Sequence, residues 1–195
     1  MKGVSILILA AGNASRMGRV KQLLPYKNST LLGNAIKSAL QSKADTVYCV
    51  LGANSERIQN EIIEPQVTFI INKGWQSGLS SSIVRGITYL QRLKEEPKAV
   101  LVMLADQPNI DANYLNILIK LHEKNNEIVA SVYNKTKGVP AIFPSTVFKS
   151  LLEIKGDKGA KLFLNNTSFT VLHLDMESTS VLKDIDTPED YKALM

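Results

Sequence analysis

The sequence predicts an α/β fold, a Rossmann-like, doubly wound and mostly parallel sheet in one domain over residues 1–195. Segments with strand and helix patterns alternate along the chain, as parallel strands joined by helices require. Two strand candidates, Val4–Ala11 and Lys98–Ala105, are almost continuously apolar, which is typical of strands covered on both faces. No repeat, low-complexity tract or linker divides the 195 residues into separate halves, and this length buries one sizeable core.

The first elements indicate a βαβ unit. Val4–Ala11 has the pattern of a strand, and Thr46–Leu51 is a second, β-branched strand. Between them, Thr30–Gln41 is expected to be helical because its apolar residues recur three and four positions apart. Ser55–Ile63 then predicts a short helix and Val67–Ile71 a third strand.

The second half continues the alternation. Leu79–Leu93 predicts a longer helix, Lys98–Ala105 is the fourth strand, and Asp111 begins a helix whose apolar residues share one face. The remaining expected elements are a strand at Ile128–Tyr133, a Pro-bounded segment at Ala141–Phe143, helices at Ser145–Leu152 and Lys158–Leu164, a strand at Phe169–Leu174, and a terminal helix from about Thr187. Ligands of such sheets bind at the carboxyl ends of the strands, so polar residues there are the candidate site.

Composition narrows the class of protein. Lys and Arg number 23 against 18 Asp and Glu, a net charge of +5 that suits small anionic ligands. These cations form no polybasic run interleaved with aromatic residues, so nucleic acid is not an expected partner. Cys49 is the single cysteine, which leaves no intrachain disulfide and no cysteine cluster for zinc. Val4–Ala11 is too short to span a bilayer and leads into no signal-peptide cleavage pattern, so we expect no membrane association and a cytoplasmic location.

The loop after the first strand predicts a phosphate site. Small residues follow the strand and offer backbone N–H groups, and Arg16 and Lys21 add two cations. The spacing after Gly12 and Gly18 fits neither a Walker loop nor the three-glycine dinucleotide fingerprint. A nucleoside triphosphate is the expected ligand, and a plain turn with two solvated cations is the alternative.

Polar clusters follow two more strands. The segment Asn72–Ser82 combines glycines, which permit close backbone approach, with three consecutive serines that either cap the next helix or contact a ligand. Trp75 in this segment is interpreted as a loop anchor. Asp106 emerges at the end of an apolar strand, where a carboxylate is suited to hold Mg²⁺ against phosphates. The alternative is that Asp106 only begins a turn ahead of Pro108.

A second carboxylate pair lies at Asp184 and Asp186. Asp186 or Thr187, followed by Pro188, is also what a helix N-terminus requires. A second acid that reached the same site as Asp106 would fix the position of a magnesium ion, so both interpretations remain open for Asp186.

Five motifs in order along the chain resemble the MobA-like nucleotidyltransferases, specifically the molybdenum cofactor cytidylyltransferase branch. The motifs are Leu-Ala-Ala-Gly-x-x-Ser-Arg-Met-Gly-x-x-Lys at 9–21, Gly-Trp-x-x-Gly-Leu-Ser-Ser-Ser-Ile at 74–83, Leu-Ala-Asp-Gln-Pro at 104–108, Gly-Asp-Lys-Gly-Ala at 156–160 and Asp-Ile-Asp-Thr-Pro-Glu-Asp at 184–190. This resemblance implies a nucleotide-diphospho-sugar transferase-like fold and Mg²⁺ dependence. It also implies transfer of CMP from CTP to the phosphate of a molybdopterin with release of pyrophosphate, and a molybdenum hydroxylase as a candidate recipient of the product.

The resemblance also implies a role for individual residues. Its catalytic residues would be Arg16, Lys21 and Asp106, with Asp106 and Asp186 on the metal. The nucleotide would contact the two cations and the residues Ala10, Ala11, Gly12, Gly78 and Ser82. Residues 1–110 thus form the expected nucleotide-binding part and residues 111–195 the acceptor-binding part.

The acceptor is expected across the cleft from the triphosphate. Gly138–Pro144 is predicted to form a rigid opening there, and the turn at Gly156, Asp157, Lys158 and Gly159 to meet the acceptor phosphate, unless that turn is an ordinary helix entry. Two alternatives stay open for the whole protein. One keeps the chemistry with another small phosphate, such as a sugar phosphate or phosphocholine, and the other is a non-catalytic accessory protein that shelters the molybdenum cofactor.

Overall fold

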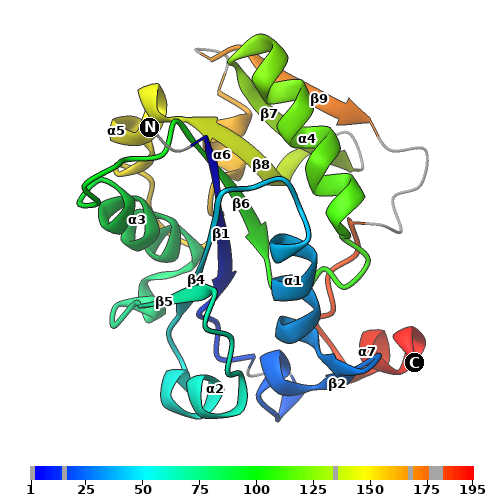
Figure 1. Ribbon diagram of the computed structural model, residues 1–195. Coiled ribbons are helices and arrows are strands. Elements are labelled where there is room, and N and C mark those ends of the chain that lie inside the picture. Colours follow the sequence, from blue (N-terminus) through cyan, green and yellow to red (C-terminus); the bar gives the residue numbers. More distant parts are fainter. Residues whose placement is uncertain (1–2, 15–16, 134–135, 167–168, 176–181) are drawn as a thin grey trace.

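A seven-stranded sheet runs through the molecule in the order β5-β4-β1-β6-β8-β7-β9 (Figure 1). The computed structural model describes residues 3–14, 17–133, 136–166, 169–175 and 182–195. Neighbouring strands pair in parallel, except that β8 is antiparallel to both β6 and β7. The strands of this sheet are β1 (Val4–Ala10), β4 (Thr46–Leu51), β5 (Val67–Ile71), β6 (Ala99–Leu104), β7 (Ile128–Tyr133), β8 (Thr136–Pro144) and β9 (Val171–Asp175). The prediction of a doubly wound, mostly parallel sheet is confirmed.

Helices follow the strands, and three of them begin at capping residues. The side chains of Thr30, Asp111 and Thr187 each accept a hydrogen bond from a backbone N–H three residues later, which satisfies one free donor of the first turn. The helices are α1 (Leu31–Leu40), α2 (Ser55–Glu61), α3 (Leu79–Leu90), α4 (Ala112–Asn125), α5 (Phe148–Leu151), α6 (Lys161–Leu164) and α7 (Pro188–Leu194), with 3₁₀ turns at Lys21–Leu23, Trp75–Ser77 and Ser145–Val147. None of these helices in the described part of the chain is long and apolar enough to cross a membrane.

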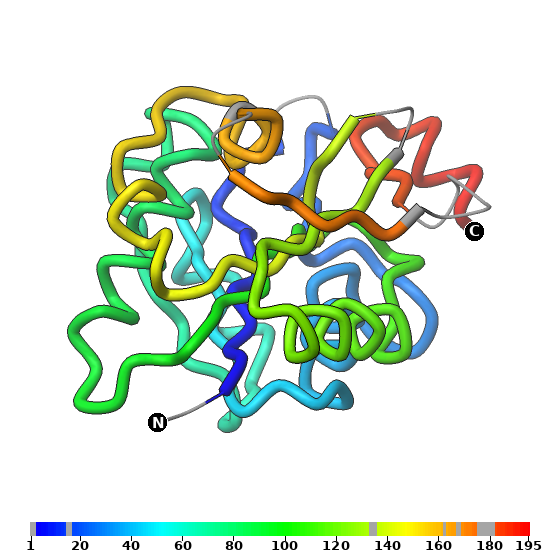
Figure 2. The backbone as a smooth tube through the Cα atoms, turned by 90° about the horizontal axis from the view of Figure 1, so that it is seen from above, coloured from blue at the N-terminus to red at the C-terminus, as the bar shows by residue number. Residues whose placement is uncertain are grey.

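The core has two layers, one on each face of the sheet. Alternate residues of β1 face opposite sides, so Ile6 and Ile8 pack with α1 and α4 while Leu7 and Leu9 pack with α3, α5 and α6. Figures 1 and 2 show α1 and α4 together on one side of β1 and α3 and α5 on the other. A Cβ atom on Gly86 of α3 would lie 2.3 Å from a methyl group of Leu7, so the absence of a side chain lets this helix approach the sheet closely.

Three segments differ from the sequence-based expectation. The Pro-bounded segment Ala141–Phe143 lies in the buried part of the nine-residue strand β8, whose prolines and glycine argue against a strand in the sequence. Helix α6 starts at Lys161 rather than Lys158, because Gly159 has a φ of +53° that a helix does not accommodate. A small hairpin of β2 (Pro25–Tyr26) and β3 (Ser29–Thr30) was not expected.

The C-terminal segment returns to the carboxyl ends of β1 and β6. The Ile185 N–H donates to the Asp106 carbonyl at 3.0 Å, and the Tyr191 hydroxyl donates to the Pro25 carbonyl at 2.6 Å. Figure 1 accordingly shows α7 beside β2. The side chain of Ile185 is buried with Leu31 and other apolar residues of the N-terminal half. This packing carries Asp184 and Asp186 to the end of β6.

Candidate active site

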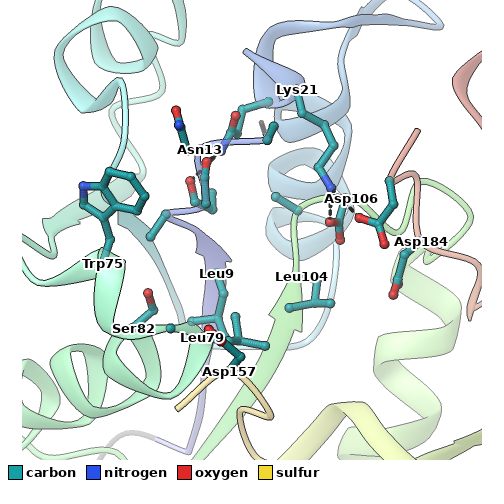
Figure 3. Close-up of a pocket in the computed structure, with 18 of the residues that line it drawn as sticks. Leu9, Asn13, Lys21, Trp75, Leu79, Ser82, Leu104, Asp106, Asp157 and Asp184 are labelled. Atoms are coloured by element: carbon teal, nitrogen blue, oxygen red, sulfur yellow. Dashed lines mark hydrogen bonds and ion pairs between the residues drawn. The ribbon is translucent and has the colours of Figure 1, made fainter. Parts of the chain in front are cut away.

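A cavity of about 580 Å³ opens at the carboxyl ends of β1 and β6 (Figure 3). In the order of the sheet, β1 lies between β4 and β6, so the chain winds to one side and then to the other at this point. This is where open α/β sheets bind ligands, and the volume is in the usual range for small-molecule sites. The lining comes from residues 9–14, Lys21, Gln22, Leu31, 75–76, 78–79, Ser82, 104–106, Asp157, Asp184 and Asp186.

One wall is the backbone of Ala10, Ala11 and Gly12, which Gln22 and Ala53 hold in place. The Gln22 side-chain amide donates to the carbonyls of Ala10 and Gly12 at 2.8 and 2.9 Å, and the Ala53 N–H donates to the Ala11 carbonyl at 3.0 Å. A Cβ on Gly12 would have no heavy atom within 4 Å, so this part of the wall is open. Gln22 was missed by sequence reasoning, and its one signal was a polar residue directly after the candidate phosphate-binding lysine.

Three predicted residues meet at the opposite wall. The Lys21 ammonium lies 2.6 Å from Asp106 Oδ2 and 3.1 Å from Asp186 Oδ1, although these residues are far apart in the sequence. Burial by itself lowers the pKa of Lys21, but the charges of both carboxylates and their hydrogen bonds outweigh it and raise the pKa. Lys21 is therefore a fixed cation. The predicted partner cation, Arg16, lies outside the described residues.

The structure separates the two interpretations of Asp186. Thr187 and Asp190 form the capping box of α7, in which each side chain accepts from the other residue's backbone N–H. The carboxylate of Asp186 is therefore not needed to cap the helix, and it faces Lys21 instead.

A third carboxylate, Asp184, lines the same end of the cavity (Figure 3). Its Oδ1 atom is buried and has no hydrogen-bond partner among the described residues. Burial, followed by the nearby charge of Asp106, raises the pKa of Asp184 to about 6. Sequence reasoning noted this residue but gave it no role. Its signal was its place two residues before Asp186.

Replacing Asp184 is expected to change the pH dependence of stability. The pKa of this carboxyl rises from 3.8 to about 6 on folding, so the native state loses stability relative to the unfolded chain as pH rises through that window. With chelator present, Asp184→Asn should match the wild type near pH 4. At pH 7.5 it should be more stable by about 1–2 kcal/mol, a value reduced for the solvent that reaches this half-buried group. Urea unfolding at both pH values measures the difference, and equal stabilities at pH 7.5 would contradict the prediction.

Only one of the three consecutive serines lines the cavity. The Ser81 hydroxyl donates to the Gly78 carbonyl at 2.8 Å, and the buried Ser80 hydroxyl lies 3.5 Å from the Gly159 carbonyl. Ser82 accepts a hydrogen bond at 3.1 Å from the Asn72 amide and faces the cavity together with Gly78. The serines thus divide between loop structure and a ligand-facing role.

Trp75 also forms part of this wall. A Cβ on Gly52 would lie 2.6 Å from the Trp75 Cβ and 2.7 Å from the Ala11 carbonyl, so Gly52 makes room for both. Trp75 is therefore anchored, as the sequence indicated, and it lines the cavity as well.

The turn predicted to meet the acceptor packs against the start of α3. The Ser80 N–H donates to the Gly156 carbonyl at 3.1 Å, and a Cβ on Gly159 would lie 2.8 Å from a methyl group of Leu79. Asp157 lines the cavity, whereas Lys158 is exposed and does not.

The prediction of a rigid opening at Gly138–Pro144 is wrong, because these residues form part of a strand. These residues are buried in the centre of the sheet as part of β8, and they line no part of the cavity. The small residues and prolines fill the core because β6 and β7 flank them on both sides.

Comparison with known proteins gives one family. Residues 6–171 match the MobA-like NTP transferase domain. The chain is similar to nicotine blue oxidoreductase of Paenarthrobacter nicotinovorans, at 28% identity over 98% of this chain and 96% of that protein. It is likewise similar to the purine catabolism protein PucB of Bacillus subtilis, at 29% identity over 95% and 92% of the two chains. The molybdenum cofactor cytidylyltransferase of Escherichia coli is 23% identical over 98% and 95%.

Solved structures agree with this result. Rv0371c of Mycobacterium tuberculosis is 28% identical, with a TM-score of 0.84 over 99% of this chain and 97% of that one. A second Rv0371c structure is a complex with manganese, at 27% identity and a TM-score of 0.83 over the same shares. A nucleotidyl transferase from Methanothermobacter shares the fold, with 18% identity and a TM-score of 0.82 over 98% and 95%.

Proposed function

Because the chain belongs to the MobA-like NTP transferase family and is a nucleotidyltransferase, we propose that it transfers CMP from CTP to the phosphate of a molybdopterin and releases pyrophosphate. One observation carries the proposal: the Lys21 ammonium and the carboxylates of Asp106 and Asp186 converge at one end of a nucleotide-sized cavity. A site that only sheltered a cofactor would have no need of this arrangement.

The reaction requires the protein to position the two reactants and to stabilise the negative charge that develops on the phosphates. An oxygen of the acceptor phosphate attacks the α-phosphorus of CTP, and the bond from that phosphorus to the pyrophosphate oxygen breaks in line with it. The attacking oxygen is already anionic, so no strong general base is needed. Lys21 stabilises the charge that develops on the transferred group and on pyrophosphate, and Arg16 is proposed to assist it. Ala10, Ala11, Gly12, Gly78 and Ser82 are proposed to hold the nucleoside.

The carboxylates are suited to hold Mg²⁺. Asp106 Oδ1 is buried without a hydrogen-bond partner among the described residues, so an oxygen is available to a cation. In the described part of the chain no three His, Cys, Asp or Glu side chains could hold a metal ion alone. Asp106 and Asp186 would thus share the ion with phosphate oxygens and water, the ligand set that Mg²⁺ prefers. The manganese complex of Rv0371c supports a divalent ion in this family. When bound, such an ion neutralises phosphate charge.

The acceptor is tested directly. The protein is incubated with Mg²⁺, CTP and one of three acceptors, molybdopterin, a sugar phosphate or phosphocholine, while pyrophosphate release and product mass are followed. The proposal expects a cytidylylated molybdopterin. Modification of another phosphate alone would replace the acceptor, and the absence of pyrophosphate with every acceptor would favour the accessory protein. A cytidylylated product would also identify a molybdenum hydroxylase as the partner to test.

The turn of Gly156, Asp157, Lys158 and Gly159 was expected on the acceptor side, and a contact with the acceptor anion stays proposed for its Lys158. Only Asp157 of these four lines the cavity. A side chain at Gly159 would press on Leu79, which lines the cavity, so bulky variants there would disturb the nucleotide as well. Lys158→Ala is the cleaner test of a contact with the acceptor anion.

CTP is expected to be preferred over GTP. The basis is Ala11 in Leu-Ala-Ala-Gly, where the guanylyl-transferring branch tends to have glycine. The Ala11 side chain leaves less room beside this loop, which suits the smaller pyrimidine ring. Initial rates at matched concentrations measure the preference. Rates with GTP that equal or exceed those with CTP would overturn the branch assignment while leaving the family intact.

A further inference from the structure

We propose that Asp157 reads the base of the nucleotide, by accepting a hydrogen bond from the exocyclic amino group of cytosine while the Ser82 hydroxyl donates to the neighbouring ring nitrogen. This inference rests on the proposed function, because it takes CTP as the donor. It assigns Asp157 to the nucleotide end of the cavity, in place of the acceptor contact that the motif suggested.

The two ends of the cavity differ in chemistry. Lys21, Asp106 and Asp184 lie together at one end, whereas Ser82, Leu79 and Asp157 lie at the other (Figure 3). A triphosphate bound at the lysine end places its base toward the second end, past the backbone of Ala10 to Gly12.

Asp157 reaches the cavity because Gly78 has no side chain. A Cβ on Gly78 would lie 2.3 Å from Asp157 Oδ1 and 2.7 Å from the Gly156 carbonyl oxygen. The hydrogen bond from the Ser80 N–H to that carbonyl fixes the turn against the first residues of α3. Among the described residues, no ion pair or hydrogen bond engages the Asp157 carboxylate, so its oxygens can accept from a ligand.

Ser82 supplies the complementary donor. It lies in the first turn of α3, four residues after the N-cap Gly78, and lines the cavity together with Gly78 and Asp157. Its oxygen accepts from the Asn72 amide at 3.1 Å, and no other described residue receives its hydroxyl proton in a hydrogen bond. A hydroxyl that already accepts still has one proton to donate. The second end of the cavity therefore presents a donor next to an acceptor.

This pair fits one edge of cytosine. Cytosine presents a ring-nitrogen acceptor beside an amino donor, which carboxylates recognise well. Uracil and guanine present the reverse order, a ring N–H beside a carbonyl. Adenine shares the cytosine order but has a larger ring. Cytosine and uracil have the same ring size, so a comparison of CTP with UTP tests the hydrogen-bonding pattern of the base independently of its size.

The test is calorimetric titration of CTP, UTP and pyrophosphate in the presence of Mg²⁺ and without acceptor. We expect the wild type to bind CTP about 10–100-fold more tightly than UTP. Asp157→Asn, whose amide also donates to the uracil carbonyl, should bring this ratio to within about threefold of unity. Its affinity for pyrophosphate, which occupies only the lysine end, should stay unchanged. Glu153→Gln, which removes one exposed negative charge outside the cavity, is the matched control and should keep the wild-type ratio.

The outcomes separate this inference from the proposed function. A wild type that does not discriminate CTP from UTP, or an Asp157→Asn variant that keeps the wild-type ratio, would overturn the assignment of Asp157 while leaving cytidylyl transfer in place. A wild type that binds neither nucleotide would overturn the proposed function itself. An equal loss of affinity for CTP and pyrophosphate in Asp157→Asn would show a general effect on the site and also reject the assignment.

Discussion

Asp106→Asn is expected to lower turnover by on the order of a hundredfold or more, because it removes a negative charge at the point where Lys21 and the proposed metal meet the phosphates. The side chain lies at the end of β6, 2.6 Å from the Lys21 ammonium. Asparagine has nearly the same size and keeps the backbone carbonyl that binds the Ile185 N–H. The fold should therefore survive. Asp186→Asn should act in the same direction, with a smaller loss, because its side chain is 52% exposed.

The measurement is the rate of pyrophosphate release at saturating CTP, with circular dichroism and thermal unfolding as checks of the fold. Glu61→Gln is a suitable control, since it removes a carboxylate from the exposed pair with Arg57, which contributes little to stability. A folded Asp106→Asn protein that retains near-normal turnover would exclude this residue from the catalytic site.

The fold was predictable because each strand and helix carries its own pattern. Continuous apolar runs indicated β1 and β6, and the helices expected to begin near Thr30, Asp111 and Thr187 do begin there, each capped by that residue. Strand β8 was not recognised because its prolines and glycine oppose a strand locally. Pairing with β6 and β7 overrides that preference, and single-sequence patterns do not contain such pairing.

The site was predictable where a residue follows a strand and less so where packing decides. Asp106 comes just after β6 and Ser82 lies in the first turn of α3, the helix after β5, and the structure brings both to one cavity. Asp184 and Gln22 were missed or left without a role because their importance comes from neighbours distant in sequence, such as Asp106 and the Ala10 carbonyl. The contacts of the turn at 156–159 with the start of α3 were not predicted, because they join segments far apart in the sequence.

Replacing Lys21 should separate two effects that Asp106→Asn combines, the loss of turnover and the loss of metal affinity. Lys21→Met keeps the length of the side chain and removes its charge, so turnover should fall by on the order of a hundredfold or more for want of charge stabilisation on the phosphates. In the absence of nucleotide, however, this variant should bind Mn²⁺ about tenfold more tightly than the wild type, because no ammonium lies between the carboxylates of Asp106 and Asp186. Asp106→Asn should weaken the same binding.

Mn²⁺ affinity is measured by electron paramagnetic resonance on nucleotide-free protein, and unfolding curves show whether each variant is folded. Lys21→Arg keeps the positive charge and should bind Mn²⁺ much as the wild type does, which separates charge from packing. The arrangement predicts that Mn²⁺ affinity rises in Lys21→Met and falls in Asp106→Asn, while both variants lose turnover. Unchanged Mn²⁺ affinity in a folded Lys21→Met protein would mean that the ion binds away from the gap that this ammonium fills, and the assignment of Asp106 and Asp186 as its ligands would then be wrong.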